Sequence, residues 1–222
     1  MIAAVVLASG FSRRMGRSKL DLELGGRTFL RRAIDAATGA RGIERCLVVV
    51  RPEDEFKVQS PKSQMNTGSK PSGSSDPALE TLRPRIELML NSRAEEGQSA
   101  SIRLATEHLV ADQGVEAAIF AVVDQPFLTS DVFERLVSAW QAGDSEILVS
   151  SYAGQRGNPV LFARRFFPEL GQLTGDVGGR DVMRRHPEAV REVSMPDAAA
   201  GQDVDTWEDY ELASKQIEMP NA

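Results

Sequence analysis

Short apolar runs alternate along this chain with longer segments in which apolar residues recur at helical spacing. The runs with the length and composition of buried strands are residues 2–7, 46–50, 86–90, 117–123 and 147–150. Helical spacing is present at residues 29–37, 102–109 and 132–140. The residues expected at helix ends are Ser130 and Asp131 at a start, and Gly39 and Gly143 at two stops.

This order of strands and helices predicts an α/β fold, in which a mostly parallel sheet is covered by helices on both faces. In such sheets, ligands bind beyond the carboxyl ends of the strands. Candidate chemistry is therefore expected in the residues directly after Leu7, Leu90 and Val123.

The charge balance excludes one class of partner. Lys and Arg number 26 against 32 Asp and Glu, a formal net charge of −6, so no overall basic field attracts nucleic acid. A phosphorylated ligand must then be held by a local cluster of cations. The apolar run at residues 2–7 is too short for a signal sequence or a membrane span, so we expect a cytoplasmic protein without a membrane partner.

The length of 222 residues suits one domain, 1–222, and one stretch departs from the compact pattern. Residues 60–77 are rich in Ser, Pro, Gly and Lys, and are expected to form a flexible surface insertion. The single cysteine, Cys46, lies in an apolar run and is expected to be a buried side chain rather than a nucleophile.

The loop from Leu7 to Lys19 has the composition of a phosphate-binding segment. Gly10 and Gly16 permit positive φ and let backbone N–H groups approach anionic oxygens, while three arginines and Lys19 add positive charge. The spacing fails the P-loop pattern, because Lys19 does not directly follow Gly16, and G-x-G-x-x-G is absent. The loop is therefore a phosphate site of another kind.

Three aspartates are candidates for a metal site. Asp124 ends the run 117–123 at the carboxyl edge of the sheet, where carboxylate oxygens suit Mg²⁺. Asp203 and Asp205 lie two residues apart in an extended segment, and so on the same side of the chain. Two interpretations stay open for this pair: further metal ligands, with Asp205 preferred, or caps of a helix expected from Thr206.

The loop resembles the signature L-A-[AG]-G-x-S-x-R-M-G-x-x-K of nucleotidyltransferases related to the molybdenum-cofactor guanylyl- and cytidylyltransferases. The matching residues are Gly10, Ser12, Arg14, Met15, Gly16 and Lys19. At the third position of the signature, the cytidylyl branch has Ala and the guanylyl branch has Gly, and this chain has Ser9, which is intermediate between the two. Residues 124–126, Asp-Gln-Pro, resemble the Asp-x-Pro of the cytidylyl branch. Residues 203–209 resemble D-[IV]-D-T-P-E-D, with Trp207 in place of the proline.

Residues 97–102, 157–162 and 175–180 also resemble motifs of the cytidylyltransferase-like members. The resemblance implies a Rossmann-like three-layer α/β/α fold, and a Mg²⁺ ion on Asp124, Asp205 and Asp203. It implies that Arg14 and Lys19 hold the β- and γ-phosphates, and that Asn158 and Arg180 face the acceptor. The implied substrate-binding residues are Leu7, Ala8, Ser9, Gly10, Ser12, Gly97, Ser99, Ser101, Asn158, Gly178 and Arg180.

The activity that this resemblance implies is transfer of CMP from CTP to the phosphate of a molybdopterin-type cofactor, with release of pyrophosphate. Arg14, Lys19 and Asp124 are its expected catalytic residues, and a client molybdoenzyme or its chaperone is the expected protein partner. Three alternatives remain: guanylyl transfer from GTP, transfer to another phosphorylated acceptor, and a non-catalytic factor that binds nucleotide or cofactor.

Overall fold

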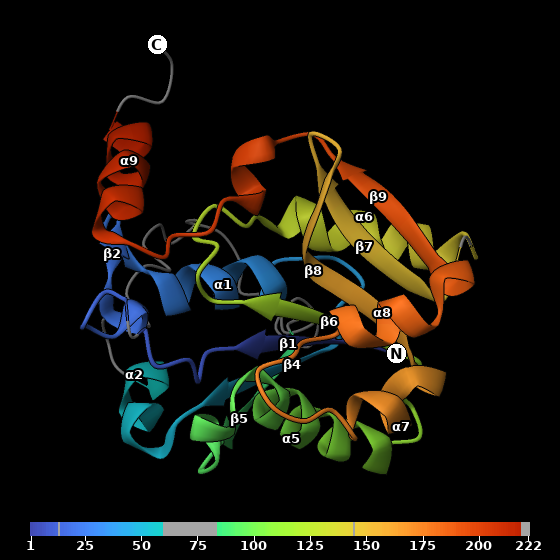
Figure 1. Ribbon diagram of the computed structural model, residues 1–222. Coiled ribbons are helices and arrows are strands. Elements are labelled where there is room, and N and C mark those ends of the chain that lie inside the picture. Colours follow the sequence, from blue (N-terminus) through green and yellow to red (C-terminus); the bar gives the residue numbers. More distant parts are fainter. Residues whose placement is uncertain (13, 60–83, 144, 219–222) are drawn as a thin grey trace, which may run out of the picture.

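The computed structural model describes residues 1–12, 14–59, 84–143 and 145–218, so the insertion predicted at 60–77 lies outside the described residues. Within these ranges, a seven-stranded sheet runs in the order β5-β4-β1-β6-β8-β7-β9 (Figure 1). The strands in that order are Arg85–Leu90, Arg45–Val50, Ile2–Leu7, Ala117–Val122, Gln155–Ala163, Ile147–Tyr152 and Val190–Met195. Only β8 opposes its two neighbours, and the other pairings are parallel.

All five predicted strands are present with ends within two residues of those expected, which confirms a mostly parallel sheet. The expectation of burial is wrong for β5, which is an edge strand with Ile86 and Leu90 exposed. The sequence pattern missed β8 and β9. Near its start, β8 contains Gly157, Asn158 and Pro159, which are residue types typical of turns. β9 is an edge strand with exposed charged positions, so it lacks the continuous apolar run of a buried strand.

Helices cover both faces of the sheet and make a three-layer α/β/α arrangement (Figure 1). The helices on one face are α1 (Phe29–Thr38) and α6 (Ser130–Gln141), and those on the other are α5 (Gln98–Ala111) and α7 (Phe167–Leu170). Because successive strand residues point to opposite faces, alternate residues of each strand pack against each helix layer. The fold is Rossmann-like α/β, as expected.

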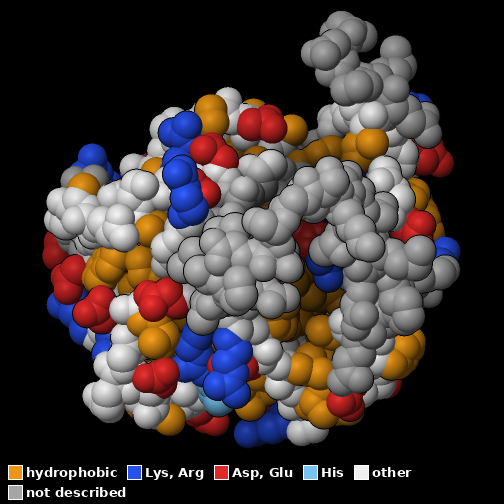
Figure 2. Space-filling view, turned by 180° about the vertical axis from the view of Figure 1, so that it is seen from behind, with side chains coloured by type: hydrophobic (Ala, Val, Ile, Leu, Met, Phe, Trp, Pro, Cys, Tyr) orange, Lys and Arg blue, Asp and Glu red, His pale blue; other side chains and the backbone are white. Residues whose placement is uncertain are grey.

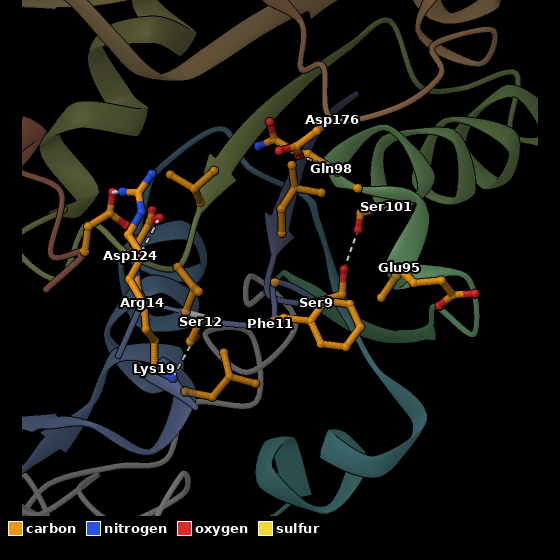
Figure 3. A pocket seen from close by; sticks show the side chains of 18 of the residues that line it. Ser9, Phe11, Ser12, Arg14, Lys19, Glu95, Gln98, Ser101, Asp124 and Asp176 are labelled. Atoms are coloured by element: carbon orange, nitrogen blue, oxygen red, sulfur yellow. Dashed lines mark hydrogen bonds and ion pairs between the residues drawn. The ribbon is translucent and has the colours of Figure 1, made fainter. Parts of the chain in front are cut away.

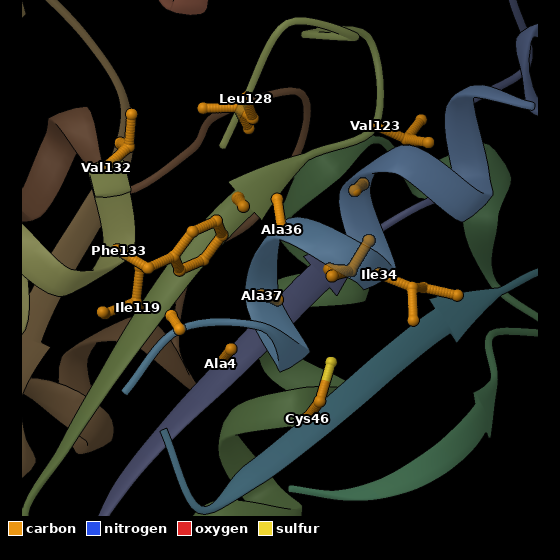
Figure 4. Close-up of a cluster of buried hydrophobic side chains, with 14 of the residues drawn as sticks. Ala4, Ile34, Ala36, Ala37, Cys46, Ile119, Val123, Leu128, Val132 and Phe133 are labelled. Carbon is orange, nitrogen blue, oxygen red and sulfur yellow. The ribbon is translucent and has the colours of Figure 1, made fainter. Parts of the chain in front are cut away.

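The α1–α6 face shows how this core is built (Figure 4). Ala4, Cys46 and Ile119 point from β1, β4 and β6 toward Phe133 and the apolar side of α1, and all are buried. The expectation of a buried Cys46 is confirmed, and burial raises the pKa of its thiol to about 12. The thiol is therefore a core side chain without nucleophilic reactivity at neutral pH.

Helix starts differ in detail from the sequence expectation. Thr28 caps α1, since its hydroxyl accepts a hydrogen bond from the Arg31 N–H at 3.2 Å, and α1 ends before Gly39 as expected. The N-cap of α6 is Thr129, with no side-chain cap bond, and the predicted Ser130 is the first helical residue. The first turn of a helix frays easily, so its start is defined only to within a residue or two, and the predicted helix is confirmed.

The described residues also form a short hairpin and three further α-helices (Figure 1). They are the hairpin β2 (Glu23–Leu24) and β3 (Arg27–Thr28), and the helices α2 (Glu55–Gln59), α8 (Arg180–Arg185) and α9 (Trp207–Glu218). No helix in the described ranges is long and apolar enough to cross a membrane. On the face shown in Figure 2, acidic and basic side chains are interspersed where described residues are visible, with no single basic patch.

Candidate active site

A cavity of about 610 Å³ opens at the carboxyl ends of β1 and β6, beside the start of α5 (Figure 3). This nucleotide-sized space, here called the first compartment, adjoins a second compartment of about 1200 Å³. The residues that line both compartments are Leu7, Arg14, Gln98, Asp176 and Asp205. Most of the sequence-predicted site residues meet in this cleft, as expected for the carboxyl edge of a parallel sheet.

The loop after β1 is shaped by its own short-range hydrogen bonds. The Ser12 hydroxyl accepts from the Lys19 N–H at 3.0 Å, and the Ser12 carbonyl accepts from the Met15 N–H at 3.1 Å. Gly16 adopts φ +63°, which the turn requires and which glycine adopts without strain. These bonds turn Arg14 and Lys19 toward the cavity that they line.

Positive and negative side chains interlock at one end of the first compartment. The Lys19 ammonium lies 2.5 Å from Asp205 Oδ1 and 3.6 Å from Asp124 Oδ2, and Arg14 Nη1 lies 2.7 Å from Asp205 Oδ2. Lys19 is buried, whereas Arg14 and Asp205 are exposed enough that solvent weakens their mutual attraction. We call these four residues the charged end; their ion pairs can be exchanged for contacts with an anionic ligand.

Asp124 carries the most perturbed carboxyl group of the charged end. Burial raises its pKa to about 6, and the nearby Lys19 ammonium opposes part of that rise. Its Oδ1 atom is fully buried and has no hydrogen-bond partner among the described residues. A buried carboxylate oxygen without a partner costs stability, which indicates a position kept for a ligand.

The C-terminal segment is tied to the end of β6. The Val204 N–H donates to the Asp124 carbonyl at 2.9 Å, which brings Asp205 to the charged end. Asp209 accepts hydrogen bonds from the backbone N–H groups of Asp205 and Thr206, at 3.0 and 2.8 Å, and so fixes the start of α9. Thr206 in turn caps α9, since its hydroxyl accepts from the Asp209 N–H at 3.2 Å, and Asp205 is left for the cavity.

At the opposite end of the first compartment, three neutral side chains are buried, while Glu95 and Glu96 also line the cavity. The hydroxyls of Ser9 and Ser101 bond to each other across the floor of the cavity, and the buried Asn91 donates to both, at 3.3 and 3.0 Å (Figure 3). Asn91 follows β5 directly, and no sequence motif singled it out. We call Ser9, Asn91 and Ser101 the neutral end; it presents hydroxyl groups and no net charge.

Gly97 joins the two compartments by close packing. Its φ is +93°, and a Cβ atom there would lie 2.8 Å from Asp176 Cα and 2.9 Å from the Gly175 carbonyl oxygen. The Gln98 N–H also donates to Asp176 Oδ1, at 3.3 Å. Only glycine permits this approach of the loop before α8 to the start of α5.

Residues 4–190 match the family model described as MobA-like NTP transferase domain. The chain belongs to this family. It is 26% identical over 219 residues to the purine catabolism protein PucB of Bacillus subtilis strain 168, with 97% of each chain covered.

Solved structures of similar proteins share this fold over nearly the whole chain. An Rv0371c homologue from Mycobacterium sp. strain JC1 is 25% identical with a TM-score of 0.75, covering 99% of this chain and 98% of the other. Rv0371c from Mycobacterium tuberculosis H37Rv is 26% identical with a TM-score of 0.73, covering 96% and 97%. A further Rv0371c structure, a complex with manganese, matches at 24% identity and a TM-score of 0.69, covering 96% and 98%.

The second compartment of this NTP transferase contains the acceptor-side residues expected from the sequence. Asn158, Gly178 and Arg180 line it, together with Arg156 and Arg184, which sequence reasoning did not single out. Arg156 pairs with Glu192 at 2.7 Å, and Arg184 contacts Asp181. Together with Arg14, four guanidinium groups therefore line a space large enough for a bulky anionic molecule.

Three predicted residues of the NTP transferase are not brought to either compartment. Ala8 is fully buried, and its N–H donates to the Val49 carbonyl at 2.8 Å. Ser99 is fully buried and accepts a hydrogen bond from Arg103 at 3.1 Å, because it lies on the inner side of α5. Asp203 lines neither compartment and accepts from the Gln125 side chain at 2.9 Å.

The carboxylates of the charged end, Asp124 and Asp205, match part of the ligand set of a divalent cation. The described residues contain no group of three or more His, Cys, Asp or Glu side chains arranged to hold a metal ion. Asp124 and Asp205 both face the Lys19 ammonium, and the unpartnered Oδ1 of Asp124 is a hard oxygen ligand of the kind that Mg²⁺ and Mn²⁺ prefer. Two carboxylates suffice where substrate phosphates complete the coordination shell.

Proposed function

We propose that this NTP transferase moves CMP from CTP to the phosphate of a molybdopterin-type cofactor and releases pyrophosphate. The observation that carries the proposal is the junction of the two compartments at Arg14 and Asp205, beside Lys19 and Asp124. A nucleotide in the first compartment would present its phosphates at this junction. An acceptor in the second compartment would reach the same place with its own phosphate.

The size and charge of the second compartment support a large, phosphorylated acceptor. Its volume of about 1200 Å³ exceeds that of most pockets for small molecules. Arg156, Arg180 and Arg184 reach it from β8 and α8 and supply the planar cations that bind phosphate in bidentate fashion. A pterin with a phosphorylated side chain fits this combination of volume and charge.

The residues of the charged end have separate tasks in the proposed transfer. The acceptor phosphate oxygen attacks the α-phosphorus, a new P–O bond forms there, and the bond to the β-phosphate breaks as pyrophosphate leaves. Arg14 and Lys19 neutralise the negative charge that builds up on the leaving group. The nucleotide and the acceptor would both be held in the cleft before the reaction, which removes much of the entropic cost of aligning them.

Asp124 and Asp205 would hold a divalent cation, which we propose to be Mg²⁺, with Asp203 adding negative charge nearby while Gln125 holds it in place. The cation supplies Lewis-acid stabilisation of phosphate oxygens when bound. The manganese complex of Rv0371c supports divalent metal use in similar proteins. Lys19 would move from the two aspartates toward the phosphates as the carboxylates take the cation.

The base and the acceptor are the least constrained parts of the proposal. GTP in place of CTP needs the same charged end, so guanylyl transfer to the same acceptor is the second candidate. The cytidylyl assignment is favoured by the Asp-Gln-Pro at residues 124–126, whose Gln125 holds Asp203 at 2.9 Å. Other phosphorylated acceptors and a non-catalytic binding role are distinguished by the product that forms.

Pyrophosphate release tests the proposal directly. Purified protein is incubated with Mg²⁺ and CTP or GTP, with and without the pterin cofactor. We expect release with CTP that requires the pterin. Release without the pterin, or with a different phosphorylated acceptor only, would contradict the acceptor assignment, and nucleotide binding without release would favour the binding-factor alternative.

A further inference from the structure

The neutral end contains a buried side chain that touches no part of the cavity and yet controls the two hydroxyls that do. Asn91 is 3% exposed and does not line the first compartment, whereas Ser9 and Ser101 do. Its backbone N–H donates to the Val50 carbonyl at 2.7 Å, so its position is fixed by the neighbouring strand as well. Asn91 is therefore rigidly held under the cavity floor.

The orientation of the Asn91 amide follows from its partners. The Arg93 backbone N–H points at Oδ1 from 2.9 Å, and an N–H group requires an acceptor there. Nδ2 must then face the serines, and it donates to both Ser9 Oγ and Ser101 Oγ. The amide group thus acts toward the hydroxyl pair only as a donor.

Counting donors and acceptors shows what the pair has left for a ligand. Two hydroxyls have two hydrogens and four lone pairs. Asn91 occupies one lone pair on each oxygen, and the bond between Ser9 and Ser101 uses one hydrogen and one further lone pair. One O–H donor on one serine and one lone pair on the other remain.

We propose that Asn91 is a positioning residue for nucleotide selection: it makes Ser9 and Ser101 present one donor beside one acceptor to the base. The proposal rests on the proposed function, because the phosphates belong at the charged end and the base is then left for the neutral end (Figure 3). Cytosine offers a complementary edge, with the N4 amino donor next to the N3 acceptor; guanine also has one donor beside one acceptor, at N1 and O6, but its N2 amino donor then finds no partner in the hydroxyl pair. The arrangement costs no buried charge, since all three residues are neutral.

Asn91→Asp changes this pattern at constant shape. At pH 8, the carboxylate accepts from both serine hydroxyls, so the pair can present lone pairs only. Two adjacent acceptors fit a base edge with two adjacent donors, which guanine has at N1 and N2. We expect the affinity for CTP to fall about tenfold, the effect of one neutral hydrogen bond lost or mismatched, and the preference for GTP over CTP to rise by at least as much.

Asn91→Ala removes the amide without adding a charge. It tests the role of Asn91 even if the Asn91→Asp variant does not fold. It frees both hydroxyls to rotate, so CTP is expected to bind about 3- to 10-fold more weakly, in KM, with kcat little changed. The matched control is Thr106→Val, because Thr106 is also buried in polar contact, donating to the Ile102 carbonyl of α5 at 2.6 Å, but lies outside the cavity.

The measurements are calorimetric affinities for CTP and GTP and the ratio of the two kcat/KM values, for each variant and the unaltered protein. Normal CTP binding in Asn91→Ala together with an unchanged GTP-to-CTP ratio in Asn91→Asp would overturn the positioning role and leave the proposed function intact. If the unaltered protein binds neither nucleotide, the proposed function fails and this inference fails with it. An equal loss in Thr106→Val would assign the effect to general loosening of α5 and also overturn the role.

Discussion

The two ends of the first compartment hold their ligand-facing groups in opposite ways. The charged end is made of ion pairs between loops far apart in sequence, with Arg14 and Asp205 open to solvent. The neutral end is made of hydrogen bonds among Ser9, Asn91 and Ser101, and all three residues are buried. The exposed Arg14–Asp205 pair can exchange partners at little cost, whereas the buried network of the neutral end cannot move without leaving polar groups unsatisfied.

This difference assigns different tasks to the two ends. Ion pairs that solvent already weakens are suited to rearrangement around phosphates and a cation. A buried neutral network is suited to discrimination, because a wrong ligand leaves its donors or acceptors unpaired. We therefore expect the charged end to set turnover and overall affinity, and the neutral end to set the choice of nucleotide.

The largest effect is expected from Asp124→Asn. The amide keeps the shape of the side chain but loses the negative charge that would hold a cation, so kcat is expected to fall about 10²- to 10⁴-fold. Steady-state pyrophosphate release measures this. The control is Asp131→Asn on α6, whose side chain pairs with Arg135 away from the cleft; a rate within about threefold of normal for Asp124→Asn would remove Asp124 from the catalytic machinery.

Lys19→Met comes next, because it removes a buried ammonium while keeping the length of the side chain. KM for the nucleotide is expected to rise and kcat to fall together, by about 10- to 100-fold in kcat/KM, since the phosphates lose one cation in both the bound and the reacting state. Arg41→Met removes an exposed cation that pairs with Glu134. Equal kinetics in the two variants would contradict the phosphate role of Lys19.

At Gly97, where the two compartments meet, stability depends on close packing of the backbone rather than on charge. Gly97→Ala is expected to destabilise the fold by about 1–3 kcal/mol and to weaken binding in both compartments, because the new Cβ strains the backbone and pushes against Asp176. Gly154→Ala is the matched control, with φ +82° and no atom within 4 Å of the added Cβ. Denaturant unfolding of both variants separates crowding from backbone strain, and equal losses would show that the close approach contributes nothing.

Ionic strength should separate the two ends without any mutation. Raising added salt from about 0.05 to 0.5 M shortens the screening length severalfold, so the affinity for CTP is expected to drop several-fold. The ratio of CTP to GTP affinity is expected to stay constant, because the neutral end has no net charge. A ratio that changes with salt would show that charged groups read the base.

The smallest expected effect concerns stability against pH in metal-free buffer. The native pKa of Asp124, about 6, lies above the usual value of about 4, so the folded protein holds this proton more tightly than the unfolded chain. Ionisation then costs stability, with no cost below about pH 4 and the full cost above about pH 6. Asp124→Asn is therefore expected to gain a few degrees in Tm over the unaltered protein between about pH 4 and 6, and no further gain above that; a constant difference across this range would contradict the raised pKa.

Much of the fold follows from local sequence signals, while two strands do not. Continuous apolar runs identify β1, β4, β6 and β7, which lie inside the sheet and need apolar residues on both faces, whereas β5 is found from a mostly apolar run although it is an edge strand with Ile86 and Leu90 exposed. β8 enters the sheet through a Gly-Asn-Pro segment and β9 lies at its edge. Their pairing depends on long-range packing, which local patterns in the sequence do not reveal.

The candidate site divides in the same way. The glycine loop, Asp124 and Asp205 could be predicted because each motif follows a recognisable strand or precedes a helix. Asn91 stands directly after Leu90, where the carboxyl edge of the sheet predicts candidate chemistry, but its role could not be predicted, because an asparagine after a strand is also typical of a simple turn. Its partners lie 82 and 10 residues away in sequence, so only the folded chain shows that it supports Ser9 and Ser101.

The fate of the α-phosphate tests the central claim, that the two compartments act as one transfer site. The protein is given CTP labelled at the α-phosphorus, a divalent cation and the pterin cofactor, and the products are separated. The account predicts that the label appears on the pterin in amounts equal to the pyrophosphate released. Label found only in free CMP, or remaining in CTP despite bound pterin, would contradict it.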